Sequence, residues 1–119
     1  CLAKALLSNS TLQKLVLNAN SIKNSGSQAI AQSLISKSSL LILKLQQNEI
    51  TDEGAYELAR MLEFNSCLQT LDIRFNNISA HGIKAIAKAL FTNFTLRTLK
   101  LANNSIGTEG AKALAKPLV

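Results

Sequence analysis

Residues 68–95 read LQTLDIRFNNISAHGIKAIAKALFTNFT, and this pattern of leucine, asparagine, isoleucine and glycine recurs every 28 residues along the 119-residue chain. Recurrence at such a spacing, without an insertion, is typical of a solenoid, in which each repeat buries its apolar face against the next one. The sequence therefore predicts a single domain over residues 1–119, with repeats near 12–39, 40–67, 68–95 and 96–119 and a partial helix at 1–11.

The quoted repeat predicts one strand followed by one helix. Leu71 and Ile73 alternate with polar residues, which is the period of a short strand with one buried face. Residues 83–90 place apolar side chains at helical spacing. We expect residues 79–82 to form the crossing into the helix, with Gly82 supplying either a close backbone approach or an unusual dihedral angle. Four such units predict an α/β fold with parallel strands on a concave face and helices on a convex face.

An asparagine follows each predicted strand inside a tight turn. Its amide can accept from a backbone N–H group and donate to a backbone C=O group at the same time. We expect the stacked asparagines to form a structural ladder along the solenoid, made of Asn20, Asn48, Asn76 and Asn104.

Composition limits the classes of partner. The net charge of +6 is spread over single lysines and arginines, and 4% aromatic residues offer few stacking platforms, which argues against nucleic acid. No apolar run approaches the roughly 20 residues of a membrane span. Cys1 and Cys67 show no C-x-x-C spacing, which favours free thiols in a reducing compartment and a cytoplasmic location.

The chain offers no pattern for catalysis. The single histidine, His81, falls in a predicted crossing loop, and the sequence holds no G-x-x-x-x-G-K-[ST] phosphate loop and no His/Cys metal spacing. Asp52 and Glu53, with Glu49, form a small acidic cluster that a loop surface explains. The sequence therefore predicts a protein that is not an enzyme, with no cofactor, no metal and no small-molecule ligand.

The candidate site lies on the strands, between the leucines, where side chains should point to the concave side. Phe75 is the most unusual of these residues, because its equivalents are Ala19, Gln47 and Asn103. Arginine and aromatic side chains are common anchors of protein interfaces. Variation at exposed positions is also what the fold alone permits. The predicted partner-binding patch, called here the concave patch, consists of Lys44, Gln46, Asp72, Arg74, Phe75 and Lys100.

The run L-x-x-L-x-L-x-x-N-x-I, followed by glycine and an A-x-x-[LI]-A-x-x-L helix, resembles the ribonuclease-inhibitor type of leucine-rich repeat. Phrases such as residues 93–99 (NFTLRTL) and 110–115 (GAKALA) look like the C-terminal sensor arrays of nucleotide-binding, oligomerisation-domain-like receptors. They look equally like leucine-rich-repeat-only proteins and, less closely, like the Ran GTPase-activating protein. The resemblance implies a cytoplasmic module for protein–protein interaction, and the two chain ends, which lack a polar capping unit, predict a segment of a longer array.

Three functions follow as hypotheses. The first is a non-catalytic module that binds a protein on its concave face, for instance as the sensor arm of a cytoplasmic innate-immune receptor. The second is a regulator of a small GTPase, acting through Asn77 and Asn103, and the third is a purely structural scaffold.

Four asparagines match N-x-[ST], the glycosylation pattern of secreted proteins, namely Asn9, Asn77, Asn93 and Asn103.

Overall fold

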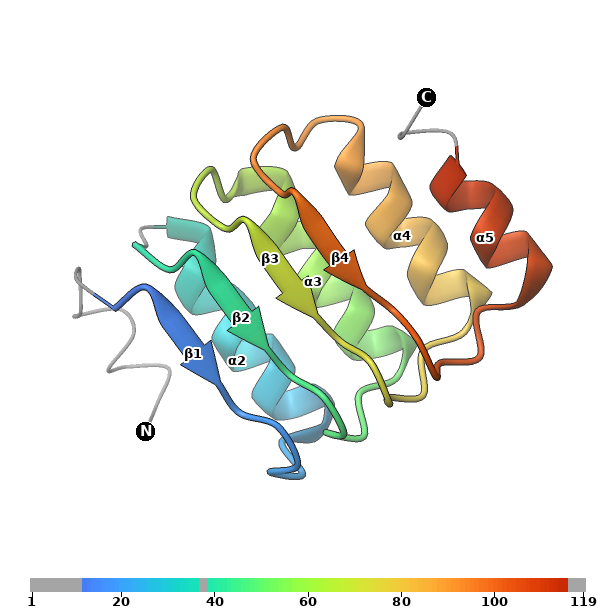
Figure 1. The fold of residues 1–119 in the computed structure, drawn as a ribbon, viewed down its shortest axis with the longest axis horizontal. Helices are drawn as coiled ribbons and strands as arrows, with labels where there is room; N and C mark the ends of the chain where they lie inside the picture. The colour runs from blue at the N-terminus through green and yellow to red at the C-terminus, as the bar shows by residue number, and fades with distance from the viewer. Residues whose placement is uncertain (1–11, 37–38, 116–119) are drawn as a thin grey trace.

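The computed structural model describes residues 12–36 and 39–115, over which strands and helices alternate (Figure 1). The strands are three residues long and the helices run from nine to fourteen residues. In chain order the elements are β1 (Lys14–Val16), α2 (Lys23–Ser36), β2 (Ile42–Lys44), α3 (Asp52–Phe64), β3 (Thr70–Asp72), α4 (Ala80–Leu90), β4 (Thr98–Lys100) and α5 (Gly107–Ala115).

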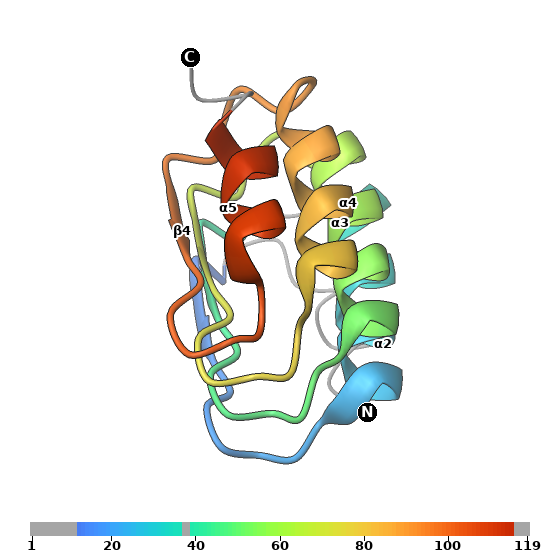
Figure 2. The same ribbon diagram turned by 90° about the vertical axis from the view of Figure 1, so that its right-hand side faces the viewer.

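The strands form one parallel sheet in the order β1-β2-β3-β4. Their register pairs residues that stand in the same place in consecutive repeats, so Leu15 lies opposite Leu43, and Leu43 opposite Leu71. The side view shows two layers, with the strands on one side and the helices on the other (Figure 2). The predicted α/β solenoid of four repeats, with strands lining one face and helices the other, is confirmed.

The core lies between these two layers and is deepest in the second and third repeats. Leu43 and Leu71, which project from the middle of β2 and β3, are fully buried. The equivalent leucines of the outer strands, Leu15 and Leu99, are only partly buried, because each has a neighbouring repeat on one side among the described residues. Stacking of neighbouring repeats therefore supplies most of the burial, as expected for a solenoid.

The helices begin earlier than the sequence pattern predicts. Helix α4 begins at Ala80, inside the stretch expected to cross between the layers, because Ser79 caps it by accepting a hydrogen bond from the His81 N–H. Gly82 consequently lies in the first turn of the helix. A Cβ atom there would meet Asp52 Oδ1 at 2.6 Å and Ile78 Cγ2 at 2.8 Å, so the close approach is correct. Gly107, not Gly82, is the glycine with a positive φ, at 61°.

Some sequence predictions lie outside the described residues, namely the partial helix at 1–11 with Cys1 and Asn9. Within the described ranges, the longest helix has 14 residues, and no helix is long and apolar enough to cross a membrane.

Candidate functional site

A ladder of asparagine side chains fixes the turns that follow the strands. Asn76 Oδ1 accepts hydrogen bonds from the backbone N–H groups of Asn48 (2.9 Å) and Ile50 (3.1 Å) in the preceding repeat. Its Nδ2 donates to the carbonyl oxygens of Leu45 (3.1 Å) and Ile73 (2.9 Å). Asn76 is 6% exposed, so these bonds are shielded from water. Each turn is therefore shaped by the repeat after it.

The ladder continues to both ends of the array. Asn48 accepts from Asn20 N at 2.9 Å and donates to Leu17 O at 2.9 Å, repeating the bonds of Asn76 one layer earlier. Asn104 accepts from Ile78 N at 3.1 Å. Asn20 lies at the exposed end of the ladder. The four asparagines thus hold the strand ends and the residues that project from them.

A second set of side chains joins each helix to the next one. Asn24 Oδ1 accepts from Thr51 N at 2.9 Å and from Gly54 N at 3.1 Å, at the start of α3. One repeat later, Asp52 Oδ1 makes the same two bonds at the start of α4. These side chains satisfy backbone donors that a helix N-terminus leaves without intrahelical partners. The equivalent residue in the third repeat is Ala80, which has no polar side chain to offer to α5.

Asp52 corrects the prediction of an acidic loop cluster. It is the first residue of α3, and it accepts from Ser79 N (2.8 Å), Ser79 Oγ (2.5 Å) and Gly82 N (3.2 Å). Partial burial would raise the pKa of Asp52, but the hydrogen bonds from Ser79 and Gly82 and the charge of His81 outweigh it, and the pKa falls below its ordinary value of 3.8. Asp52 is a structural anion.

A third set of polar side chains, the buried Asn65 and Asn93, bonds the turns that follow α3 and α4. Asn93 Oδ1 accepts from Leu96 N at 2.8 Å, and its Nδ2 donates to Leu62 O at 2.8 Å. Asn93 is 8% exposed, so the nitrogen that would carry a glycan is bonded inside the fold. The sequence prediction places Asn93 in a glycosylation pattern and leaves Asn65 out. The 28-residue recurrence of asparagine at these positions was the available signal.

The concave patch lies on the outer face of the sheet and just beyond the ends of its strands. Lys44 (β2) and Lys100 (β4) flank Asp72 (β3) in the strand register. Lys100 and Phe75 are exposed, whereas Lys44, Gln46 and Arg74 are partly buried. The structure thus brings the six predicted residues onto one face, with different degrees of exposure.

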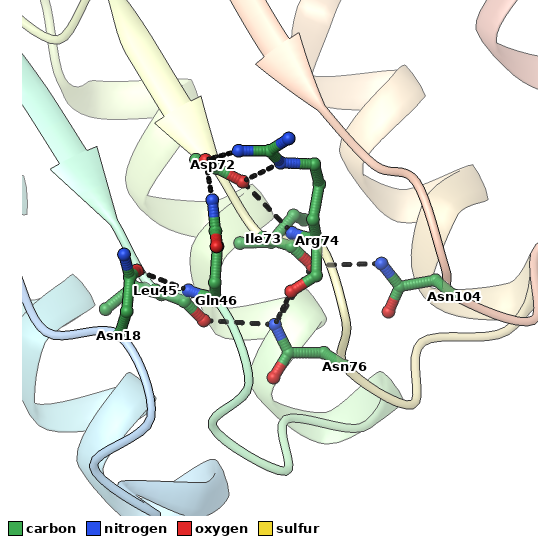
Figure 3. A network of polar contacts seen from close by, with 8 residues as sticks. All are labelled: Asn18, Leu45, Gln46, Asp72, Ile73, Arg74, Asn76 and Asn104. Atoms are coloured by element: carbon green, nitrogen blue, oxygen red, sulfur yellow. Dashed lines mark hydrogen bonds and ion pairs between the residues drawn. The ribbon is translucent and has the colours of Figure 1, made fainter.

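Asp72 departs from the predicted exposed charge, because its side chain is completely buried, with 0% exposure. Arg74 covers it with Nε 3.0 Å from Oδ1 and Nη2 2.9 Å from Oδ2, and Gln46 Nε2 donates to Oδ2 at 2.6 Å (Figure 3). Burial would raise the pKa of Asp72, but the hydrogen bonds from Arg74 and Gln46 and the Arg74 charge hold it below 3.8. Asp72 therefore supports the patch from beneath and offers no carboxylate to a partner.

Phe75 has an unusual backbone conformation. Its φ is 57°, in the left-handed region, and its equivalents Ala19, Gln47 and Asn103 have φ values of 58°, 54° and 60°. The left-handed conformation costs about 1–2 kcal/mol for most residues and is least costly for glycine, asparagine and aspartate. Phe75 is also 46% exposed, so packing offsets only part of that cost. All four repeats share this conformation, so it belongs to the turn of the fold, and what distinguishes Phe75 is an exposed aromatic side chain at that turn.

The groups that could support chemistry are few among the described residues. His81 is exposed in the first turn of α4, and Cys67 is a partly buried free cysteine. In residues 12–36 and 39–115, no three histidine, cysteine, aspartate or glutamate side chains gather in a way that could hold a metal ion. The described surface instead presents polar and aromatic side chains.

The fold and the repeating ladders define a leucine-rich repeat protein, and a comparison with protein families agrees. A family model described as "Leucine Rich repeat" matches residues 8–31, 36–59, 64–87 and 92–115. The chain belongs to the leucine-rich repeat family. A comparison with curated proteins found no match.

Solved structures show the same fold. The structure of leiomodin-1 actin-binding site 2 is 24% identical, with a TM-score of 0.91 over 98% of this chain and 69% of the other. The Caenorhabditis elegans tropomodulin C-terminal domain is 11% identical, with a TM-score of 0.64 over 98% of this chain and 90% of that one. At these identities, the likeness establishes the architecture.

Proposed function

We propose that this protein is a non-catalytic module for protein–protein interaction, which binds its partner on the strand face through the concave patch. The observation that carries the proposal is Phe75, an aromatic side chain that is 46% exposed at a turn position where the other repeats have alanine, glutamine and asparagine. Beside it lies Arg74, whose guanidinium is fixed by Asp72. An exposed aromatic side chain next to a fixed arginine is a common composition for the centre of an interface.

The comparisons suggest a first partner to test. The solved structure with a TM-score of 0.91 is that of leiomodin-1 actin-binding site 2, and it matches 98% of this chain. Actin binding is therefore a second, more specific candidate within the same class of function. Co-sedimentation with filaments, together with a binding titration against monomeric actin, tests it directly.

Two finer hypotheses come from the resemblance of the repeats. The module would serve as the sensor arm of a cytoplasmic receptor of the nucleotide-binding, oligomerisation-domain-like type, which accords with the free thiol of Cys67. Alternatively, it would regulate a small GTPase, as in the Ran GTPase-activating family, with Asn77 and Asn103 as contacts. Stimulated GTP hydrolysis in an assay that mixes this protein with a small GTPase would favour this alternative. A purely structural scaffold would show neither partner binding nor stimulated hydrolysis.

The decisive experiment compares Phe75→Asn with Phe94→Ala. Asparagine is the residue found at the equivalent position 103, so Phe75→Asn removes the aromatic ring from a backbone that accepts the change. Phe94 is 89% exposed in the loop between α4 and β4, and it serves as a control for the loss of a surface aromatic ring. Arg74 is left intact because its removal would uncover Asp72.

We expect the wild type and Phe94→Ala to capture the same set of proteins from cell extract, and Phe75→Asn to capture none of that set. Loss of a central aromatic anchor typically weakens binding by about 2 kcal/mol or more. Quantitative mass spectrometry of the three captures makes the measurement. Identical captures by all three proteins would refute binding through the concave patch.

A further inference from the structure

The two layers of the fold carry different charges. The strands present Lys14, Lys44 and Lys100 on their outer face, and their single acidic residue is Asp72. The remaining described acids lie elsewhere, on the helices or in the loop before α3. These are Glu49, Asp52, Glu53, Glu57, Glu63 and Glu109.

The charge of Asp72 is already neutralised inside the protein. Its side chain is fully buried, and both of its oxygens accept hydrogen bonds from Arg74. Among the described residues, the ion pairs are Arg74–Asp72 and Lys23–Glu49, so the three strand-face lysines have no acidic partner within the described fold. The strand face therefore exposes positive charge that nothing on the same face balances.

The spacing of these lysines suits an extended polypeptide. Lys44 and Lys100 are each in register with Asp72, one strand to either side. Neighbouring strands lie about 4.8 Å apart, so the two lysines stand about 10 Å apart at their backbones. An extended chain in the polyproline II conformation rises about 3.1 Å per residue and brings every third side chain back to the same face, so it covers that distance in about three residues. Apolar surface lies on the same side of the fold, at Val16, which is 48% exposed, and at Phe75.

We propose that the strand face recognises an acidic, extended polypeptide segment of a partner protein. Its carboxylates face Lys44 and Lys100, and an apolar side chain of the segment packs against Phe75. This inference rests on the proposed function and names the chemistry of the partner. Charge complementarity of this kind accelerates association and selects among partners, and added salt weakens it.

The same surface fits a nucleic acid less well. Arginine binds phosphate best through a free, planar guanidinium, but two of the three nitrogens of Arg74 are committed to Asp72. Binding of single strands also depends on several aromatic platforms, and Phe75 is the one aromatic residue in the concave patch. Isolated lysines, which act as point charges, suit carboxylates that are spaced along a peptide.

The test measures binding of a fluorescent synthetic peptide that has glutamate at every third position and one phenylalanine. The strand-face variant Lys44→Glu/Lys100→Glu is compared with Lys84→Glu/Lys88→Glu, which makes the same change of net charge on the exposed surface of α4. We expect the strand-face variant to bind about tenfold more weakly, and the helix-face variant to stay within about twofold of the wild type. Binding of the wild type should also weaken as salt is added.

Three outcomes would overturn the inference. They are absence of peptide binding, equal weakening by the two variants, and tighter binding of a single-stranded oligonucleotide than of the peptide. The proposed function is judged separately, by the dependence of protein capture on Phe75. If protein capture requires Phe75 but is unchanged by substitution of Lys44 and Lys100, the proposed interaction module stands and the proposal of an acidic partner segment is refuted.

Discussion

Replacing Asn76 with alanine should be among the most damaging single substitutions in this protein. The change removes the acceptor for the N–H groups of Asn48 and Ile50 and the donor to the carbonyl of Leu45. An unsatisfied buried polar group costs about 1–3 kcal/mol, so these three orphaned groups together cost at least about 3 kcal/mol. Natural domains have a free energy of unfolding of only about 5–15 kcal/mol, so a loss of this size should shift the unfolding transition clearly.

Two other carbonyls that Asn76 contacts keep a second partner and are left out of this sum. The Ile73 oxygen still accepts from Asn104 Nδ2 at 2.9 Å, and the Arg74 oxygen from Gln47 N at 3.2 Å. The expected loss in free energy of unfolding is therefore set by the groups that lose their last hydrogen-bond partner, and not by the number of bonds removed.

The matched control is Asn20→Ala at the exposed end of the same ladder. Asn20 Nδ2 donates to Asn18 O at 3.1 Å in an exposed setting, so its loss should cost no more than about 1 kcal/mol. Urea unfolding followed by circular dichroism at neutral pH measures both variants. Equal destabilisation by the two substitutions would refute the reasoning, because it would mean that burial of the ladder contributes nothing.

Two further predictions concern helix starts and acid. Ala80→Asp should raise the free energy of unfolding by about 1 kcal/mol, because the new carboxylate can accept from the Gly107 N–H at the start of α5, just as Asp52 accepts from the equivalent Ser79 N–H. Thermal unfolding measures this gain, and unchanged stability would contradict the cap. Asp72 has a folded pKa below its unfolded value of 3.8, so its contribution is present above pH 3.8 and is lost as the pH falls through the folded pKa. Asp72→Asn should therefore be less stable than the wild type at neutral pH and flatter over that acidic window in urea titrations at stepped pH, and parallel curves would argue against it.

The repeat period, the strand–helix order and the two-layer architecture could be predicted from the sequence. They depend on apolar residues such as Leu71 and Ile86, whose spacing reports burial directly. Stacking forces the same spacing on every repeat, so four copies reinforce one another. The concave patch could be located by the same reasoning, since strand residues alternate between the core and the outer face.

The features that escaped the sequence depend on side chains from a neighbouring repeat. Helix α4 begins at Ala80 because Ser79 caps it and because Asp52, 27 residues before Ser79, accepts from the Ser79 and Gly82 N–H groups. Asp72 is buried beneath Arg74 together with Gln46, which lies 26 residues earlier in the neighbouring repeat. Local spacing cannot report such contacts, although the alignment of one repeat on the next brings the residues into the same column. The positive φ of Phe75 escaped for another reason, since phenylalanine is a poor indicator of a left-handed turn.

The side-chain contacts between repeats also affect how such a chain can lengthen during evolution. The repeat at residues 40–67 gives Asn48 to the unit before it and Asp52 to the unit after it, so an in-frame tandem copy of its coding segment would find both neighbours ready. A copy of residues 68–95 would instead bring a second Ala80 and leave another helix start without a side-chain acceptor from the preceding repeat. Gene duplication is thus easier through one unit than through the next, and Ala80 marks where growth of the array by copying is penalised.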